Sequence, residues 1–462
     1  MIVRHYLSKE VLFVMADDIQ ATPRHLSQKH HMTIHWKDSI ADDNICATKA
    51  SLNERAGVVG RVGIMLLSCG TGAWRVRDAM NVVARALNLT CSAEVGLLTI
   101  SYTCFSQNLS HSQILTLPKS GVNTDKLGRI ESFVRNFAQE CTHLTIRQIH
   151  IKLDKIQKRP GNYNAWQAAL AAAVACSAFV FLLGGGLVEM FCCFVGAGIG
   201  NWVRKEMTNH SITMLADISV SVAVACLAYL ACFKCLELFF GISLQHEAGY
   251  IGAMLFVIPG FPFITSMLDM SKLDMKSGLE RLAYALTIIV TATLVGWIVA
   301  LTVHLRPKNF LPLNLSPMLM LFLRLIASFF GVYGFSIMFN SPRKMAFWAG
   351  ILGALGNTLR LELVDLTHIP AGTAAFAGAF LAGILASLVN KKHGYPRISL
   401  TVPAIVIMIP GLYIYRGVYN IGINSIGVGA LWLSKAAMII MFIPLGLFVA
   451  RVLLDKKWRY CD

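Results

Sequence analysis

Long apolar segments dominate the chain after about residue 162, whereas polar and apolar residues are mixed before it. Each segment is close to the ~20 residues that a helix needs to cross the hydrocarbon core of a membrane. We therefore predict an α-helical polytopic membrane protein with ten transmembrane helices, at residues 163–183, 186–203, 213–236, 249–268, 282–303, 317–339, 345–364, 370–389, 399–417 and 430–453.

The part of the chain before these helices has the pattern of a small α+β soluble domain. Helical spacing of apolar residues predicts helices at 78–87 and 126–137, and two β-rich runs at 95–105 and 112–117 predict a hairpin. Residues 1–55 are polar without a sustained apolar period, which predicts a disordered tail. The predicted divisions are the tail at 1–55, a cytoplasmic domain at 56–160, and two membrane repeats at 161–305 and 306–462.

Two Pro-Gly pairs stand in the middle of predicted membrane helices, Pro259-Gly260 in the fourth and Pro410-Gly411 in the ninth. Proline breaks the helical hydrogen-bond ladder, and a membrane tolerates the freed backbone groups only where they are buried in protein or face water. Breaks at corresponding places in two halves of a membrane protein are typical of a transporter's binding site. We therefore predict substrate binding at these four residues.

The two halves of the membrane part share a second motif. Gly200-Asn201 ends the second predicted helix and Gly356-Asn357 ends the seventh, in the same order relative to the Pro-Gly pairs. Matching motifs at a nearly constant separation indicate an internal repeat. Because each half holds an odd number of helices, the second copy would enter the membrane from the opposite side, as in transporters that work by alternating access. Asn201 and Asn357 join the predicted substrate site.

The charge of the chain sets its predicted orientation. The chain is 55% hydrophobic and 14% charged, with a mean hydropathy of +0.59 and a net charge of +16. Lys and Arg gather in the loops on one side, beginning with a basic stretch at 147–159, which places both termini in the cytoplasm. This asymmetry accounts for the positive charge, and we predict no nucleic-acid partner.

Several ionisable residues lie in or beside the predicted helices, where each needs a partner or water because a charge in hydrocarbon costs at least ~2.5–3.5 kcal/mol. Glu189 is either a proton carrier or a residue of the outer mouth. Asp269, Asp274 and Arg281 follow the first break on the inner side and either gate the cytoplasmic mouth or form a solvated loop.

Two arginines at helix ends, Arg204 and Arg360, have two open interpretations. They are suited to hold a substrate carboxylate, and equally to anchor the helices at the membrane interface. The histidines of the tail are interpreted as chance, so we predict neither a metal site nor a cofactor.

Three classes of function fit a membrane protein of this kind. A secondary exporter explains the matched breaks, whereas a channel or receptor does not require them. An intramembrane enzyme would need a catalytic set, but the chain has no Gly-x-Gly-Asp motif, no Ser/His pair within the predicted helices and no His-Glu-x-x-His. The chain is therefore predicted to be a transporter rather than an enzyme.

Six stretches resemble the threonine/serine exporter family, with both of its modules fused in one chain. The first module is carried by 68–80 (SCGTGAWRVRDAM), by 258–269 (IPGFPFITSMLD) and by 277–282 (SGLERL). The second is carried by Asn340-Ser-Pro-Arg, Gly356-Asn357 and 407–413 (IMIPGLY). The resemblance covers about 57–453. In one place the chain departs from the family pattern, because Arg77 stands where an acidic residue is usual and Asp78 follows it.

The resemblance implies export of threonine and serine from the cytoplasm, driven by the proton gradient across a bacterial inner membrane. In some bacteria the two modules are separate proteins linked to succinate export, so a dicarboxylate is the alternative substrate. Substrate, protons and the lipid bilayer are the implied partners, and the oligomeric state is open, with a homo-oligomer as one option.

A mechanism follows as a hypothesis from the broken helices. Each half-helix that begins after a Pro-Gly pair presents free N–H groups and a positive dipole end to a substrate carboxylate. Asn201 and Asn357 would hydrogen-bond the amino or hydroxyl groups. Glu189 or Asp269 would carry the coupling proton if burial raises its affinity for protons.

Overall fold

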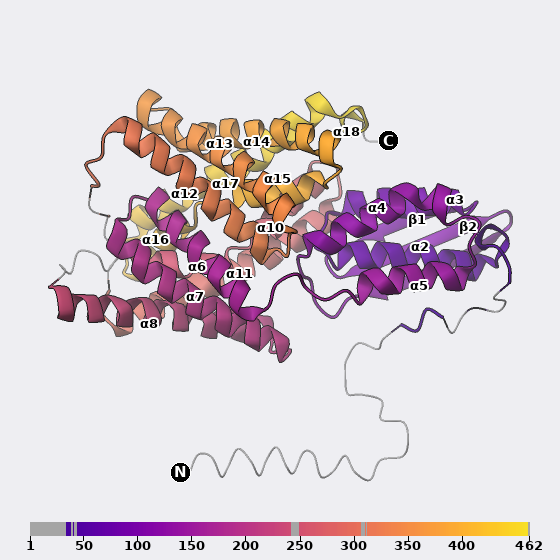
Figure 1. Cartoon of the computed structure of the whole chain (residues 1–462), viewed down its shortest axis with the longest axis horizontal. Coiled ribbons are helices and arrows are strands. Elements are labelled where there is room, and N and C mark those ends of the chain that lie inside the picture. Colours follow the sequence, from indigo (N-terminus) through magenta and orange to yellow (C-terminus); the bar gives the residue numbers. More distant parts are fainter. Residues whose placement is uncertain are drawn as a thin grey trace, which may run out of the picture.

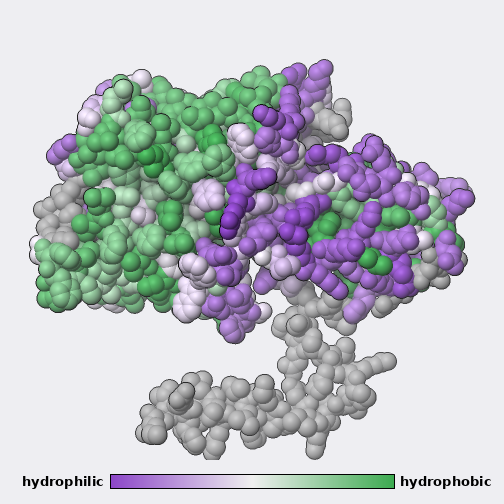
Figure 2. Space-filling view, viewed as in Figure 1, coloured by the Kyte–Doolittle hydropathy of each residue, from purple (hydrophilic) through white to green (hydrophobic). Residues whose placement is uncertain are grey.

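The computed structural model describes residues 34–37, 40, 44–241, 249–305, 310 and 312–460. It is predominantly helical and consists of an amino-terminal unit beside a larger helical body (Figure 1). The surface of the helical body is mostly hydrophobic in the view of Figure 2, whereas the amino-terminal unit is largely hydrophilic.

The amino-terminal unit combines one antiparallel sheet with four long helices. The strands pair in the order β1-β2-β3, so the sheet is a meander. Helices α2 and α3 pack on the sheet, and α4 and α5 pack on α2. Its elements are η2 (Ala47–Lys49), α2 (Leu52–Leu67), α3 (Ala73–Ala86), β1 (Thr90–Val95), β2 (Thr99–Ser106), β3 (Leu109–Thr116), α4 (Thr124–Glu140) and α5 (Ile146–Gln157).

The predicted helices and hairpin of this unit are present as α3, α4, β2 and β3, but strand β1 and helices α2 and α5 were not predicted. Strand β1 is polar and mostly exposed, so it lacks the apolar alternation that identifies a strand. Helix α2 starts at Leu52, before the predicted boundary at 56, because Ser51 and Glu54 form a capping box. Most of the predicted tail lies outside the described residues.

A glycine of α2 is required by the packing of the sheet. A β-carbon on Gly60 would overlap the ring of Tyr102, which is almost fully buried. The Tyr102 hydroxyl lies 3.0 Å from the Ala56 carbonyl oxygen and 2.7 Å from Gln113 Oε1. Gly60 therefore lets β2 approach α2 closely enough for this buried hydroxyl to find its partners.

A buried polar cluster joins α2 to α5. The Arg61 guanidinium donates to His150 Nδ1 at 3.1 Å, and it also pairs with Asp154. Burial, assisted by the neighbouring Arg61, lowers the pKa of His150 from 6.5 to about 4. Burial acts to raise the pKa of Asp154, but Lys37 and Arg61 outweigh it and hold that pKa at about 2.

This cluster predicts that the amino-terminal unit loses stability in mild acid. The unfolded chain takes up a proton on His150 near pH 6.5 but the folded one only near pH 4, so the free energy of unfolding falls by about 3 kcal/mol as the pH drops through that window. Amide exchange of α2 and α5 in the full chain measures it. His150→Asn, which keeps an acceptor for Arg61, should flatten the pH profile, whereas His143→Asn, at an exposed position, should not. An unchanged profile in His150→Asn would contradict the assignment.

Among its described residues, the helical body contains seven helices that are long and apolar enough to cross a membrane, or up to nine spans if each of two bent helix pairs counts as one. Its elements are α6 (Ala165–Leu182), α7 (Leu187–Asn209), α8 (Met214–Phe240), α9 (Tyr250–Ala253), η4 (Leu255–Val257), α10 (Gly260–Met270), α11 (Met275–Thr302), α12 (Pro317–Met338), α13 (Arg343–Thr367), α14 (Ala371–His393), α15 (Arg397–Val406), α16 (Gly411–Gly422), α17 (Ile426–Leu454) and α18 (Lys456–Arg459).

The seventh predicted membrane helix, α13, is a helix of sufficient length but is not one of these candidates. Asn357, Arg360 and Glu362 lower its hydropathy. The described structure thus supports seven to nine spans by length and composition, and the count of ten stays a prediction. Two acidic residues of α13 have a partner inside the protein, because Arg324 of α12 donates to Glu362 at 2.8 Å and also pairs with Asp365.

The same pairs of helices pack in both halves of the body: α6 with α7 and α7 with α8 in the first, α12 with α13 and α13 with α14 in the second. Glycines allow these close approaches. A β-carbon on Gly196 of α7 would lie 2.7 Å from the Ala225 carbonyl oxygen, and one on Gly356 of α13 would lie 2.8 Å from the Gly378 carbonyl oxygen. Helices α6 and α12 also pack together and so join the two halves.

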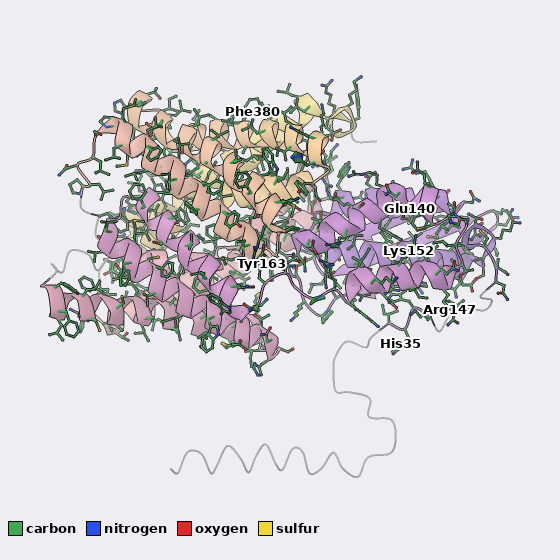
Figure 3. The ribbon with its side chains drawn as sticks, in the orientation of Figure 1. His35, Glu140, Arg147, Lys152, Tyr163 and Phe380 are labelled. Carbon is green, nitrogen blue, oxygen red and sulfur yellow. The ribbon has the colours of Figure 1, made fainter. Side chains whose placement is uncertain are left out.

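The amino-terminal unit meets the helical body at the turn between α12 and α13. Tyr163, labelled at this junction in Figure 3, donates its hydroxyl hydrogen to the Ser341 carbonyl oxygen at 2.8 Å. The backbone N–H of Asn162 donates to Asn340 Oδ1 at 2.7 Å, and that of Thr124 donates to the Phe339 carbonyl oxygen at 3.1 Å. The turn from Phe339 to Ser341 is therefore held by α4 of the amino-terminal unit and by the segment that connects this unit to α6.

Candidate functional site

Both Pro-Gly pairs break a helix in the same way. Between η4 and α10 the axis bends by 54°, and between α15 and α16 by 49°. Pro259 has φ −81° and ψ 59°, and Pro410 has φ −82° and ψ 54°. In each case the glycine N–H donates to the carbonyl oxygen of the residue before the proline, at 2.9 Å. The sequence prediction that both helices break here is confirmed.

The two breaks pack directly against each other at the centre of the body. A β-carbon on Gly260 would overlap Val406 and lie 3.2 Å from Ile409 Cδ1 of the second break. A β-carbon on Gly411 would lie 2.8 Å from Ile258 Cδ1 of the first break. Each glycine thus makes room for the apolar residues of the other break, so the two breaks are mechanically linked.

An arginine from a neighbouring helix binds the backbone just before each break. Arg204 of α7 donates from Nη1 to the Phe256 carbonyl oxygen at 3.3 Å, and Arg360 of α13 donates from Nη1 to the Met408 carbonyl oxygen at 3.0 Å. Carbonyl oxygens near a helix break lack their usual intrahelical donors, and these guanidinium groups supply one. The two arginines thus make equivalent backbone contacts, although Arg204 also pairs with Asp217 of α8 at 3.8 Å.

A cavity of about 260 Å³ lies at the first break. Its polar lining includes Lys205, Thr208 and Tyr284, and among its described lining residues none is acidic. Because α10 begins at Gly260, the positive end of that half-helix also borders the cavity. Four residues that the sequence predicted for the site line it: Asn201, Arg204, Pro259 and Gly260.

The two predicted asparagines occupy similar places but differ in surroundings. Asn201 donates from Nδ2 to the Ala168 carbonyl oxygen at 3.0 Å, and within the described part of the chain its Oδ1 accepts no hydrogen bond. Asn357 donates to Ser328 Oγ at 2.9 Å and is fully buried with its Oδ1 unsatisfied. Asn201 therefore offers the cavity an acceptor, whereas Asn357 lies outside that cavity.

The second break is more closed than the first. Gly411 borders a space of only about 30 Å³, lined almost entirely by apolar residues such as Leu255, Ile258 and Ile414. Arg360 and Asn357 are not among the residues that line the 260 Å³ cavity. The structure thus brings the predicted site residues together at the first break and keeps those of the second break apart from them.

Asp269, at the end of α10, contacts the amino-terminal unit. Its carboxylate accepts a hydrogen bond, at 3.0 Å, from the backbone N–H of Ala73, the first residue of α3. It also accepts from Ser277 Oγ at 2.9 Å and pairs with Arg281 at 3.2 Å, and both charged side chains are about 2% exposed. Arg281 in turn donates to the Gly70 carbonyl oxygen at 3.4 Å. These residues do not form a solvated loop.

Further contacts extend this attachment along the corner between α10 and α11. Asp274 pairs with Arg77, the residue that departs from the family pattern. Lys276 pairs with Glu94 at 2.7 Å, and Glu280 accepts from the backbone N–H of Leu97 at 2.6 Å. The half-helix after the first break is therefore held at its far end by the amino-terminal unit.

Glu189 lies away from the cavity, in the first turn of α7. Its Oε2 accepts from the backbone N–H of Gly186 at 2.9 Å, and the side chain is 1% exposed. A β-carbon on Gly249, just before α9, would lie 3.0 Å from Glu189 Cβ. The carboxylate therefore stabilises the start of α7 beside the beginning of the first broken helix.

One buried pair was not predicted from the sequence. Tyr250 of α9 and Tyr415 of α16 are fully buried, and their hydroxyl oxygens lie 2.7 Å apart. The Tyr415 hydroxyl is also 3.3 Å from the Gly296 carbonyl oxygen of α11. A tyrosine in each broken helix was the available indication, but nothing in the spacing showed that the two rings would meet.

Comparison with known families matches both parts of the chain. The ThrE model of the threonine/serine exporters matches residues 57–304, which is more than half of the chain. A second model, described as threonine/serine exporter, ThrE, matches residues 324–453. No solved structure matches.

Individual relatives carry two kinds of name. A Mycobacterium tuberculosis protein named as a probable threonine/serine exporter is 23% identical over 391 residues, 80% of this chain and 70% of its own. A threonine/serine exporter of Corynebacterium glutamicum is 22% identical, over 86% of this chain and 83% of its own. YjjP of Escherichia coli, named as a probable succinate transporter subunit, is 25% identical over 52% of this chain and 91% of its own.

Proposed function

The chain belongs to the threonine/serine exporter family, a family of transporters rather than enzymes, and from this premise we propose that it exports threonine and serine through the cavity at the first Pro-Gly break. The single observation that carries the proposal is the composition of that cavity. It combines the half-buried guanidinium of Arg204, an amide oxygen of Asn201 that accepts no hydrogen bond among the described residues, and the positive end of a half-helix.

Each part of the amino acid has a suitable partner there. Arg204 and the start of α10 attract the carboxylate. Asn201 Oδ1 accepts from the ammonium or hydroxyl group, and Thr208 offers a hydroxyl at the wall. The volume of about 260 Å³ is at the small end of ligand pockets, which suits a small amino acid.

Succinate is the second candidate, and a specific observation favours it. The described lining holds two cations, Arg204 and Lys205, and none of its residues is acidic. A dicarboxylate would use both cations, whereas an amino acid leaves its ammonium group without a charged partner. The name of the Escherichia coli relative agrees with this alternative.

Alternating access between two inverted five-helix repeats is the proposed mechanism. The equivalent geometry of the breaks, the paired arginines and the repeated helix packing support it. One break borders a cavity of about 260 Å³ and the other a space of about 30 Å³, as expected of one end state. We place the protein in a bacterial cytoplasmic membrane with both termini inside. The corner between α10 and α11, at Asp269–Arg281, is the proposed cytoplasmic gate.

Flux from loaded proteoliposomes tests the function. Vesicles that contain labelled threonine, serine or succinate are compared with and without a proton gradient. Gradient-dependent loss of threonine or serine is the expected result. Loss of succinate alone would mean that the cavity carries a dicarboxylate instead, and flux that does not depend on the proton gradient would indicate a channel. No flux of any of the three would contradict export.

Glu189 is the proposed proton carrier, since Asp269 is engaged by Arg281. Glu189→Gln keeps an oxygen that can accept from Gly186 but removes the titrating group, so we expect transport that no longer depends on the proton gradient. Counterflow at equal pH on both sides should persist, because it needs no net proton movement. Unchanged gradient dependence in this variant would exclude Glu189 as the carrier.

A further inference from the structure

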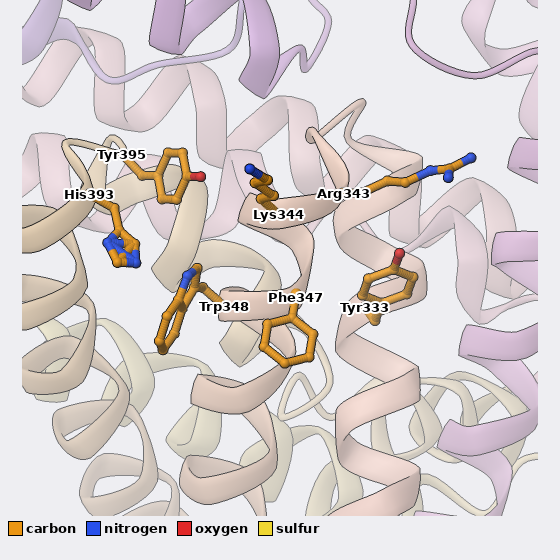
Figure 4. A pocket seen from close by; sticks show the side chains of 7 residues that line it. All are labelled: Tyr333, Arg343, Lys344, Phe347, Trp348, His393 and Tyr395. Atoms are coloured by element: carbon orange, nitrogen blue, oxygen red, sulfur yellow. The ribbon is translucent and has the colours of Figure 1, made fainter.

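An open groove of about 650 Å³, which shares no lining residue with the cavity at the first break, lies beside the amino-terminal unit where α12 ends, α13 begins and α14 ends. Figure 4 shows Lys344 between Tyr395 and Arg343, with the rings of Trp348 and Phe347 below it. His393 closes the side of the groove next to Trp348.

The two cations of this groove, Arg343 and Lys344, have no acidic partner among the described residues. Within the described part of the chain, Arg343, Lys344 and His393 make no ion pair or side-chain hydrogen bond, and no acidic residue lines the groove. Arg135 of α4 adds a further positive charge, because its Nη1 would lie 3.6 Å from a β-carbon on Gly394. Arg343 and Lys344 are both exposed, so their charges are accessible to an external anion.

The remaining wall is aromatic and continuous. The rings of Trp348 and His393 are 5.0 Å apart between centroids, and those of His393 and Tyr395 are 5.9 Å apart. Gly394 makes this possible, because its φ of +71° ends α14 and turns the chain so that His393 and Tyr395 face the same side. Indole and phenol rings of this kind are enriched where a membrane meets water.

An exposed apolar stripe leads away from the groove along α12. Tyr333 lines the groove, and Phe330, Ile326 and Phe322 follow it at helical spacing on the exposed surface. Phe347 of α13 is also exposed, and its ring packs on Phe329 next to this stripe. A polar, cationic end thus continues into an apolar track of at least three helical turns.

We propose that this groove binds an anionic phospholipid of the surrounding membrane, with the headgroup phosphate on Arg343 and Lys344 and an acyl chain along the α12 stripe. The match is one of charge and polarity: cations without a protein partner for the phosphate, aromatic rings at the interface and an apolar track for the chain. A free phosphate or a soluble anion would use the cations but would leave the stripe without a role.

The ligand also joins parts of the protein that move if alternating access operates. The groove is lined by α12, α13 and the turn after α14, and it lies beside α4 of the amino-terminal unit. A bound lipid would therefore bridge the second half of the helical body and the amino-terminal unit on the side of the membrane where they meet. This role does not depend on which solute the protein transports.

Retention of phosphatidylglycerol and phosphatidylcholine by the full-length protein, measured by native mass spectrometry, tests the proposal. We expect phosphatidylglycerol to be retained preferentially. Arg343→Gln with Lys344→Gln should reduce that preference on the order of 30-fold, since each of the two cations in contact with the headgroup contributes about a fivefold attraction. Lys391→Gln with Lys392→Gln removes two exposed cations of α14 that do not line the groove and should have little effect.

A second readout locates the lipid independently of affinity. Phosphatidylglycerol with a brominated acyl chain should quench tryptophan fluorescence, and Trp348→Phe should remove the part of the quenching that the double variant also removes. Equal retention of the two lipids, or unchanged retention in the double variant, would overturn the proposal. It would also be overturned if millimolar inorganic phosphate displaced the retained phosphatidylglycerol while the quenching of Trp348 persisted, because the retained lipid would then be bound elsewhere.

Discussion

Gly260→Leu and Gly411→Leu are each expected to reduce flux to the level of protein-free vesicles, while the proteins still insert into the membrane. A leucine at 260 would overlap Val406, and one at 411 would push against Leu255 and Ile258. Overpacking of this kind costs roughly 1–3 kcal/mol and displaces the backbone. Since each break supports the other, the change at either glycine should distort the cavity at Arg204.

The loss of flux should depend on the contact that the new side chain makes with the other break, and not on the replacement of a glycine by itself. Gly427→Leu in α17 is the matched control, because a β-carbon there meets nothing within 4 Å. Gly260→Ala should be impaired, and adding Val406→Ala should restore part of the flux by removing the overlapping methyl groups. Normal transport in both leucine variants would contradict the placement of the site at the breaks.

Asp269→Ala is expected to detach the amino-terminal unit from the first broken helix and to destabilise the protein. The substitution leaves Arg281 buried without its carboxylate and removes the acceptor of the Ala73 N–H. Breaking a buried ion pair in this way costs about 3–5 kcal/mol. Amide exchange in the first turn of α3 should rise, and thermal unfolding of the full-length protein should occur at lower temperature.

A double-mutant cycle separates the ion pair from simple loss of packing. Asp269→Ala with Arg281→Ala should be less destabilised than the sum of the single variants, because the uncompensated buried charge is gone. Asp365→Ala is the control, since that carboxylate is 52% exposed in its pair with Arg324 and should matter little. Additive effects of Asp269 and Arg281 would show that they are not energetically coupled.

The breaks in the two helices were predictable from the sequence because they depend only on the residues at each break. Proline and glycine in the middle of an apolar run fix the backbone regardless of the rest of the fold, and Pro259 and Pro410 adopt nearly identical angles. Asn201 and Arg204 were also found, since their motif precedes the break in each half. The two breaks share their backbone geometry and corresponding helix pairs pack in both halves, while the inverted repeat itself stays a prediction.

The partners of the charged residues were not predictable, because they depend on contacts between segments far apart in the chain. Asp269 is 196 residues from Ala73, and the pairing of Arg77 with Asp274 spans 197. Nothing near Asp269 in sequence distinguishes an anchor on the amino-terminal unit from a solvated loop. The meeting of Tyr250 with Tyr415 and the basic groove at Lys344 likewise arise only when distant helices pack.

Equilibrium binding of labelled threonine, serine and succinate to the purified protein tests the central claim that substrate binds at the first break. Arg204→Gln and Arg360→Gln form a matched pair, because each arginine holds a carbonyl oxygen before a break but only Arg204 lines the 260 Å³ cavity. We predict that Arg204→Gln weakens binding by about tenfold or more, as loss of a charge-assisted hydrogen bond implies, and that Arg360→Gln leaves the affinity nearly unchanged. Equal losses in the two variants, or unchanged binding in Arg204→Gln, would contradict it.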